Sequence, residues 1–244
     1  ECRDKEFVYD LYITQKLSRL EIANMFDVPK NKIASLLDYH QIPKRNRKNA
    51  RVARIQKYGS KEVSEDLMNA LEGLLLSDGT LTGMKHVTAY NLAQSRAHRE
   101  YCEYFRDRFL SEGIHAHVSE KTYLIDGKAY PGVVLNSQGL TSLNNMLERF
   151  YPDREAITTT KGVYYRKNAK VIPDDLTLTP THILHLYLGD GFASYTTLKR
   201  TQTRITLCTD GFSKSDQTEL IRLIAEAMGV RRSNFKLHKH CGHY

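Results

Sequence analysis

Two acidic residues, Asp78 and Asp190, are the strongest candidates for chemistry in this chain. Each follows an apolar run and precedes a glycine: residues 71–79 read LEGLLLSDG and residues 183–191 read ILHLYLGDG. The acids are 112 residues apart, a spacing that indicates two copies of one supersecondary unit. Converging carboxylates repel each other unless a cation lies between them, and their hard oxygens suit Mg²⁺. The pattern therefore predicts a shared Mg²⁺ site, in which Mn²⁺ or Ca²⁺ can substitute.

The elements that must position these acids are two helices that are apolar nearly all round. Such helices are buried, and two in related positions most simply bury each other. Gly73, Ser77 and Gly189 are small and spaced to let the two backbones approach closely. We expect Gly79 and Gly191 to end the helices in the left-handed cap conformation. The two acids would then lie side by side at the end of the shared interface.

The paired runs resemble the motifs of the LAGLIDADG homing endonucleases, in their single-chain form with two repeats. Residues 170–180 read KVIPDDLTLTP, which is similar to the lysine-x-Ile-Pro segment and Leu-Thr-Pro helix start of one branch of that family. The resemblance covers roughly residues 65–244. Two positions depart from it: His185 stands where glycine is usual, and Glu72 replaces a small residue. We therefore expect the interface to pack differently on its two sides.

The resemblance implies an α+β fold. Two pseudo-symmetric repeats of the αββαββα type would form antiparallel sheets shaped as a DNA-binding saddle, preceded by a small all-α helix-turn-helix unit. Only 15 residues follow Gly229, so the second repeat is expected to be incomplete at its C-terminal end. The expected divisions are a helix-turn-helix unit over 1–43, a basic linker over 44–63, the first repeat over 64–160, and the inter-repeat segment with the second repeat over 161–244.

The resemblance also implies a reaction, the metal-dependent hydrolysis of DNA phosphodiesters. Both acids would be catalytic and would hold the metal, with the backbone carbonyls of Ser77 and Gly189 as further ligands. Lys170 would lie near the scissile phosphate and offset negative charge. Gln94 would position water, and Thr209 is its counterpart in the second repeat.

The first 43 residues predict three helices. The first covers residues 6–15, with Phe7, Val8 and Leu11 facing inward. Ser18 and Glu21 form the S-x-x-E pattern of a capping box that opens the second helix. The third runs from about Asn31 to His40, and the spacing of Ala23, the turn and Ile33 resembles a helix-turn-helix, with Asp27 where glycine is common. The alternative is a three-helix packing unit with no ligand.

Charge and strand alternation predict a nucleic-acid partner. The net charge is +8 and the pI about 9.2. Residues 43–61 carry eight basic residues and no acidic one. In the first repeat, strands are expected over 80–94 and 115–137, with a hairpin turn at Asp126-Gly127, and helices over 96–111 and 140–150. Polar side chains alternate along 115–123, which predicts a polar sheet face, and Thr206 is a similar candidate in the second repeat. The residues expected to contact DNA are Lys30, Asn31, Lys32, Ser35, Lys44, Arg45, Arg47, Lys48, Arg51, Lys85, His115, His117, Lys121, Lys199, Arg200 and Arg204, with Ser119 and Tyr123 on the same face as the histidines.

Other classes of protein are disfavoured. The four cysteines show no paired spacing, so neither a disulfide framework nor a zinc ribbon is indicated. No apolar run approaches the ~20 residues needed to span a bilayer. We expect an intracellular monomer that acts on double-stranded DNA at a long asymmetric site. Two alternatives remain open, a non-catalytic transcription regulator and an RNA-binding intron maturase. A zinc site at the C-terminal end is a lesser alternative to a polar tail: His238, His240, Cys241 and His243.

Overall fold

The computed structural model describes residues 4–46, 49–50, 52–53, 57, 59–84, 86–159, 162–166, 170–195, 203–209 and 211–237. The chain divides into two compact units, Glu1–Ser60 and Lys61–Tyr244, which are described separately. No helix among these residues combines the length and the apolar composition that a membrane span requires.

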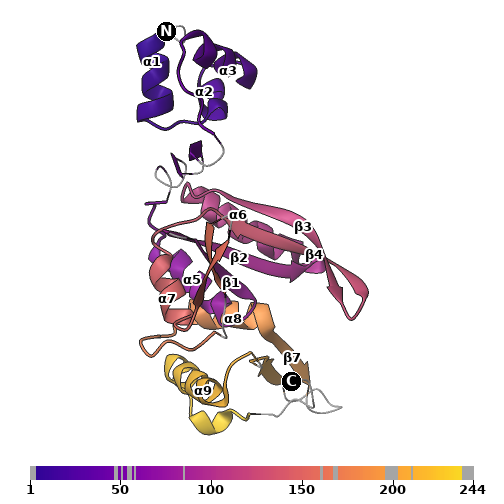
Figure 1. Cartoon of the computed structure of the whole chain (residues 1–244). Helices are drawn as coiled ribbons and strands as arrows, with labels where there is room; N and C mark the ends of the chain where they lie inside the picture. The colour runs from indigo at the N-terminus through magenta and orange to yellow at the C-terminus, as the bar shows by residue number, and fades with distance from the viewer. Residues whose placement is uncertain are drawn as a thin grey trace. The chain divides into compact units, whose positions relative to one another are not determined.

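The first unit is a small bundle of helices (Figure 1). Its elements are α1 (Lys5–Tyr9), which continues as a π-helix (Asp10–Thr14), α2 (Arg19–Met25) and α3 (Lys30–Tyr39). The predicted capping box is confirmed, because Ser18 Oγ accepts from the Glu21 amide at 3.2 Å and Glu21 accepts from the Ser18 amide at 2.7 Å. The apolar core consists of Val8, Leu11, Tyr12, Ile22, Ala23, Ile33, Leu37 and Ile42.

Phe7 does not join this core, and its predicted inward position is wrong. The side chain is 36% exposed and contacts only the edge of the cluster, with its ring centroid 5.9 Å from that of Phe26. The turn between α2 and α3 contains Asp27 at a φ of 50°, the left-handed conformation that usually selects glycine. Asp tolerates this conformation better than most residues. The tight turn is therefore made without the glycine.

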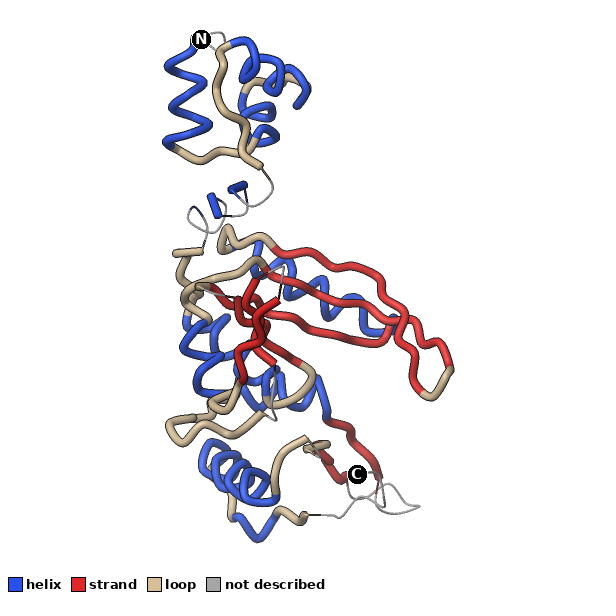
Figure 2. The backbone as a smooth tube through the Cα atoms, in the orientation of Figure 1, coloured by secondary structure: helices blue, strands red, loops and turns tan. Residues whose placement is uncertain are grey.

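The second unit begins with the predicted order of helix, two strands, helix, two strands and helix. These elements are α5 (Glu65–Leu75), β1 (Gly79–Met84), β2 (Val87–Ser95), α6 (Arg99–Ser111), β3 (Ala116–Ile125), β4 (Lys128–Ser137) and α7 (Asn144–Phe150), with a short 3-10 helix (Arg96–His98) before α6. The predicted hairpin turn is confirmed, since Asp126 and Gly127 have φ values of 50° and 75°. The β3–β4 hairpin projects past the end of β2 (Figure 2).

Two further strands, β5 (Glu155–Thr159) and β6 (Gly162–Arg166), were not predicted. They form an antiparallel hairpin in the segment between the two motifs. The hairpin joins the first sheet where Met84 pairs with Tyr164, which gives a six-stranded order of β3-β4-β2-β1-β6-β5. The last residue of β1 is therefore paired on the side away from β2.

The second motif lies in helix α8 (Pro180–Asp190). Strands β7 (Gly191–Tyr195) and β8 (Thr203–Leu207), helix α9 (Lys214–Met228) and a 3-10 helix (Arg232–Asn234) follow it. Helix α9 closes at Gly229, which takes the left-handed conformation at a φ of 64°. Strands β7 and β8 form a separate two-stranded sheet. In this sheet Gly191 pairs with Leu207, and in the six-stranded sheet Gly79 pairs with Leu92.

The six-stranded sheet has one apolar and one polar face. The apolar face contributes fully buried side chains to the core beneath the helices: Leu81, Tyr90, Leu92, Val133 and Leu135. Residues alternate between faces along a strand, and directly paired residues share a face. The pairings therefore place Thr82, Asn91, Asn136 and His117 on the opposite face.

Candidate functional site

Helices α5 and α8 lie in backbone contact. A Cβ added to Gly73 would lie 2.5 Å from the His182 carbonyl oxygen and 2.8 Å from His182 Cα. At the other end of the contact, a Cβ on Gly189 would lie 2.1 Å from Ser77 Oγ. The predicted close approach through Gly73, Ser77 and Gly189 is confirmed. Larger side chains at the two glycines would force the helices apart.

The helices end differently from the expectation. Helix α5 ends at Leu75 and the chain turns through residues 76–78, whereas α8 continues to Asp190. Gly79 and Gly191 begin strands, and Gly191 has an extended φ of −100°, so the predicted left-handed caps are wrong. Glycine is instead required by crowding. A Cβ on Gly79 would lie 2.1 Å from the Tyr90 hydroxyl, and one on Gly191 would lie 2.3 Å from the Tyr187 ring.

Asp78 and Gln94 are hydrogen-bonded. Gln94 Nε2 donates to Asp78 Oδ2 at 2.6 Å, from the second strand of the sheet. Burial raises the pKa of Asp78, and the Gln94 bond, Lys170 and His98 oppose that rise. A partly buried carboxylate of this kind keeps an affinity for protons or cations. The sequence prediction therefore selected a pair that the fold brings together.

Lys170 closes the end of α5. Its ammonium donates to the carbonyl oxygens of Leu75 at 2.7 Å, Ser77 at 2.5 Å and Gly79 at 3.3 Å. A lysine ammonium has three donors, and all three are engaged. Burial lowers the pKa of Lys170, while the charges of Asp190 and Asp78 act against that change. The Lys170 ammonium thus interacts electrostatically with both carboxylates.

The two acid-bearing turns are adjacent. The Cβ position of Gly189 lies 3.7 Å from the Asp78 amide nitrogen, and Asp190 is the next residue along α8. Asp190 is partly buried, and its carbonyl accepts from the Cys208 amide at 2.9 Å, which ties the end of α8 to the chain after β8. The sequence predicted this neighbourhood from the repeat spacing alone.

The donor set fits a hard divalent cation by its chemistry. It offers the carboxylates of Asp78 and Asp190 and nearby backbone carbonyls, which are the ligands that Mg²⁺ takes in proteins. Within the described ranges, no group of three or more His, Cys, Asp or Glu side chains could hold a metal. Any metal here would thus depend on the two acids. The Ser77 carbonyl already accepts from Lys170, so these two predicted site groups contact each other.

His185 packs against α6. Its Nδ1 is 2.8 Å from the Tyr101 hydroxyl, its ring stacks on Tyr101 with centroids 6.1 Å apart, and Phe105 meets it edge-on at 5.1 Å. Burial lowers the pKa of His185, so the imidazole favours its neutral form. This residue explains how the second motif accommodates a bulky side chain where glycine is usual.

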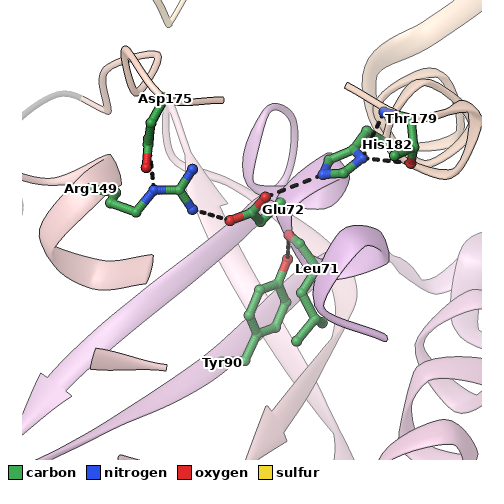
Figure 3. A network of polar contacts seen from close by, with 7 residues as sticks. All are labelled: Leu71, Glu72, Tyr90, Arg149, Asp175, Thr179 and His182. Atoms are coloured by element: carbon green, nitrogen blue, oxygen red, sulfur yellow. Dashed lines mark hydrogen bonds and ion pairs between the residues drawn. The ribbon is translucent and has the colours of Figure 1, made fainter. Parts of the chain in front are cut away.

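Glu72 is buried in a polar network that the sequence analysis missed (Figure 3). One carboxylate oxygen accepts from Arg149 of α7, and the other lies 3.2 Å from Nε2 of His182 in α8. Arg149 also donates to Asp175 at 2.9 Å. Next to this network, the Tyr90 hydroxyl donates to the Leu71 carbonyl at 3.1 Å. No local spacing relates these residues, so only the unusual acid in an apolar run could have drawn attention to Glu72.

The residues of the first unit that are expected to contact DNA differ in exposure and in their contacts. Four are exposed on the same helix α3: Lys30, Asn31, Lys32 and Ser35. Lys44 pairs with Asp38 at 2.6 Å. Arg45 points inward instead, donating to the carbonyls of Tyr12, Lys16 and Leu17 with its guanidinium 4.0 Å from the Tyr12 ring centroid. Its guanidinium is therefore occupied within the unit.

On the polar face of the six-stranded sheet, His115, His117 and Lys121 are exposed, and Lys121 lies 4.8 Å above the Tyr123 ring. Arg204 is exposed on β8. Asn91 also belongs to the polar face and donates to Thr82 at 2.9 Å. The alternation in residues 88–94 could have revealed it. The remaining predicted residues lie outside the described part of the chain: Arg47, Lys48, Arg51, Lys85, Lys199, Arg200 and the C-terminal His238, His240, Cys241 and His243.

Comparisons with known proteins agree with this geometry. A family model described as "LAGLIDADG DNA endonuclease family" matches residues 68–240. The chain is 26% identical over 211 residues to an uncharacterized protein, MJ1098, of Methanocaldococcus jannaschii, covering 84% of this chain and 72% of that protein. A solved structure of the homing endonuclease I-WcaI bound to its DNA recognition sequence is similar in fold, with a TM-score of 0.56 and 16% identity over 72% of this chain and 74% of that one.

Proposed function

Since this chain belongs to the LAGLIDADG DNA endonuclease family, we propose that it is a site-specific endonuclease that hydrolyses both strands of double-stranded DNA at a long asymmetric site. The observation that carries the proposal is the meeting of the turns that bear Asp78 and Asp190, through the contact of Gly189 with Ser77. A regulator that only binds DNA has no need of two partly buried carboxylates where two buried helices meet. The protein would act as a monomer with two repeats in one chain.

The roles of the site residues follow from their contacts. Asp78 and Asp190 would hold Mg²⁺, with Mn²⁺ or Ca²⁺ as substitutes, and a bound divalent ion supplies an activated water and charge stabilisation for the leaving oxygen. Gln94 fixes the Asp78 carboxylate through its 2.6 Å bond. Lys170 holds the backbone on both sides of Asp78 and places positive charge beside the acids.

The DNA would lie along the polar face of the sheets. Long-range affinity would come from the basic surface, and base contacts from polar side chains such as Asn91, His117 and Lys121. We propose that the first unit is a helix-turn-helix in which α3 contacts DNA through Lys30, Asn31 and Lys32. Three observations support this role: the exposure of those side chains, the left-handed turn at Asp27, and the basic segment that follows.

The test is a selection of cleaved sites from a random duplex DNA library with Mg²⁺, followed by cutting assays on the selected site. Asp78→Asn and Asp190→Asn should abolish cutting while binding to the same site in Ca²⁺ persists. Asp174→Asn is the matched control, because Asp174 is an exposed acid outside the contact between α5 and α8. Specific DNA binding by the wild-type protein without cutting in Mg²⁺ or Mn²⁺ would favour a transcription regulator, and preference for structured RNA would favour a maturase.

A further inference from the structure

The Glu72 carboxylate joins three separate parts of the second unit. Its side chain is only 11% exposed, yet both oxygens have partners, Arg149 from α7 and His182 from α8 (Figure 3). A buried carboxylate is tolerated when it is paired and hydrogen-bonded on each oxygen. Glu72 therefore has a specific role in the contact between the two motif helices, one that a small residue at this position could not fill.

The tautomer of His182 is set by its neighbours. The Thr179 amide donates to His182 Nδ1 at 3.0 Å, so Nδ1 is an acceptor and the ring proton lies on Nε2. That N–H donates to Glu72 Oε2 at 3.2 Å. One imidazole thus satisfies the amide of Thr179, the N-cap residue of α8, with one nitrogen and binds α5 with the other. The start of α8 is fixed to α5 by this single ring.

The backbone contact beside this bond is made by a glycine and a peptide group. Gly73 lies against the His182 backbone with no side chain between them. Such a contact limits how closely the two helices approach, but it does little to prevent one helix from sliding or rotating against the other. The directional bond from His182 to Glu72 adds a restraint on sliding and rotation at this point. Arg149, held in turn by Asp175, fixes the carboxylate from the other side.

Helix α8 carries His182 near its start and Asp190 at its end. The two are eight residues apart, about 12 Å along a continuous helix. A short helix moves as a rigid body, so a shift or rotation at His182 also moves Asp190. We propose that Glu72 is a positioning residue: through His182 it sets where Asp190 lies relative to Asp78. This inference rests on the proposed nuclease function.

The decisive variant is Glu72→Gln, which keeps the size of the side chain. One carboxylate oxygen becomes an NH₂ group, which cannot accept the hydrogen bond that Arg149 or His182 donates there. We expect the single-turnover cutting rate in Mg²⁺ to fall about 10- to 100-fold, as for displacements near 1 Å in other sites. DNA affinity in Ca²⁺ should change less than about twofold, because the polar sheet face is untouched. A general loss of folding would instead lower both.

Two further variants separate positioning from stability. His182→Gln should slow cutting to a similar extent, and the double variant should be no slower than either single one, because both act through one contact. Asp174→Asn is the control, since Asp174 is an exposed acid of the same segment that takes no part in the Glu72 network described above. Its cutting rate should match the wild type.

A measurement that does not depend on cutting keeps the proposal distinct from the proposed function. Amide resonances of residues 189–191 should shift in Glu72→Gln and remain unchanged in Asp174→Asn. If wild-type protein cuts and Glu72→Gln cuts equally fast, or if residues 189–191 do not shift, the positioning role is overturned. If the wild-type protein cuts no DNA while the shifts occur as expected, the nuclease proposal fails and the helix positioning stands.

Discussion

Ser77 and Gly189 meet where the two motif helices end, so closely that a methyl group on Gly189 would lie 2.1 Å from Ser77 Oγ and 2.6 Å from Ser77 Cβ. Gly189→Ala should therefore lower the free energy of unfolding by about 1–3 kcal/mol, the usual cost of overpacking. Adding Ser77→Gly removes both crowding atoms and should restore most of the loss. Urea denaturation measures the change, and Gly211→Ala, with open space around it, is the control.

The burial of Asp78 should lower the free energy of unfolding by an amount that depends on pH. Because burial raises its pKa in the folded protein, the native state binds a proton more tightly than the unfolded state does. Unfolding free energy therefore falls as pH rises from the ordinary value of 3.8 through the raised pKa. Asp78→Asn removes this cost, so its melting temperature should exceed that of the wild type at pH 7. The advantage should shrink toward pH 3, and an Asn variant less stable at pH 7 would contradict the assignment.

Lys170 should contribute to stability as well as to chemistry. Lys170→Met deletes a charged donor to three backbone carbonyls, and we expect the free energy of unfolding to fall by about 1.5–3 kcal/mol. Lys214→Met, at an exposed position at the start of α9, should change it by less than about 0.5 kcal/mol. Equal stability of the two variants would show that the ammonium does not hold the end of α5. Chemical denaturation followed by circular dichroism makes the comparison.

The exposed lysines of α3 should contribute electrostatically to DNA binding. Replacing Lys30 and Lys32 with alanine should weaken binding across sequences and reduce the slope of log K against log salt by about 2, one for each lost phosphate contact. Fluorescence anisotropy over a salt series gives the slope. Lys5→Ala, on α1 of the same unit, provides a comparison for charge removed elsewhere on the surface. An unchanged slope in the double variant would exclude α3 from the phosphate contacts.

Local patterns were sufficient for much of this protein. Apolar periodicity and turn residues predicted the order from α5 to α7, and the repeat spacing predicted that Asp78 and Asp190 share a neighbourhood. The capping box at Ser18 was recognisable because all of its atoms come from four consecutive residues. Gln94 was identified through family resemblance, and its bond to Asp78 agrees with a role at the site.

The failures share a physical origin in contacts between distant segments. The β5–β6 hairpin joins β1 through a pairing of Met84 with Tyr164, which no short window contains. Glu72 finds partners 77 and 110 residues away. The left-handed caps were expected because glycine permits them, but at Gly79 and Gly191 glycine answers crowding by Tyr90 and Tyr187. Composition alone cannot distinguish these two uses of glycine.

Arg45 ties the chain after α3 to the helical bundle of the first unit. Its backbone amide donates to the Tyr12 hydroxyl at 3.0 Å, and its guanidinium binds the carbonyl oxygens of residues 12, 16 and 17. A chimera joined directly after Pro43 would remove this arginine and expose those carbonyls and the Tyr12 ring. A chimera that carries this unit should therefore include the chain through Asn46. The three added residues keep Arg45 bound to the carbonyl oxygens and to the Tyr12 ring.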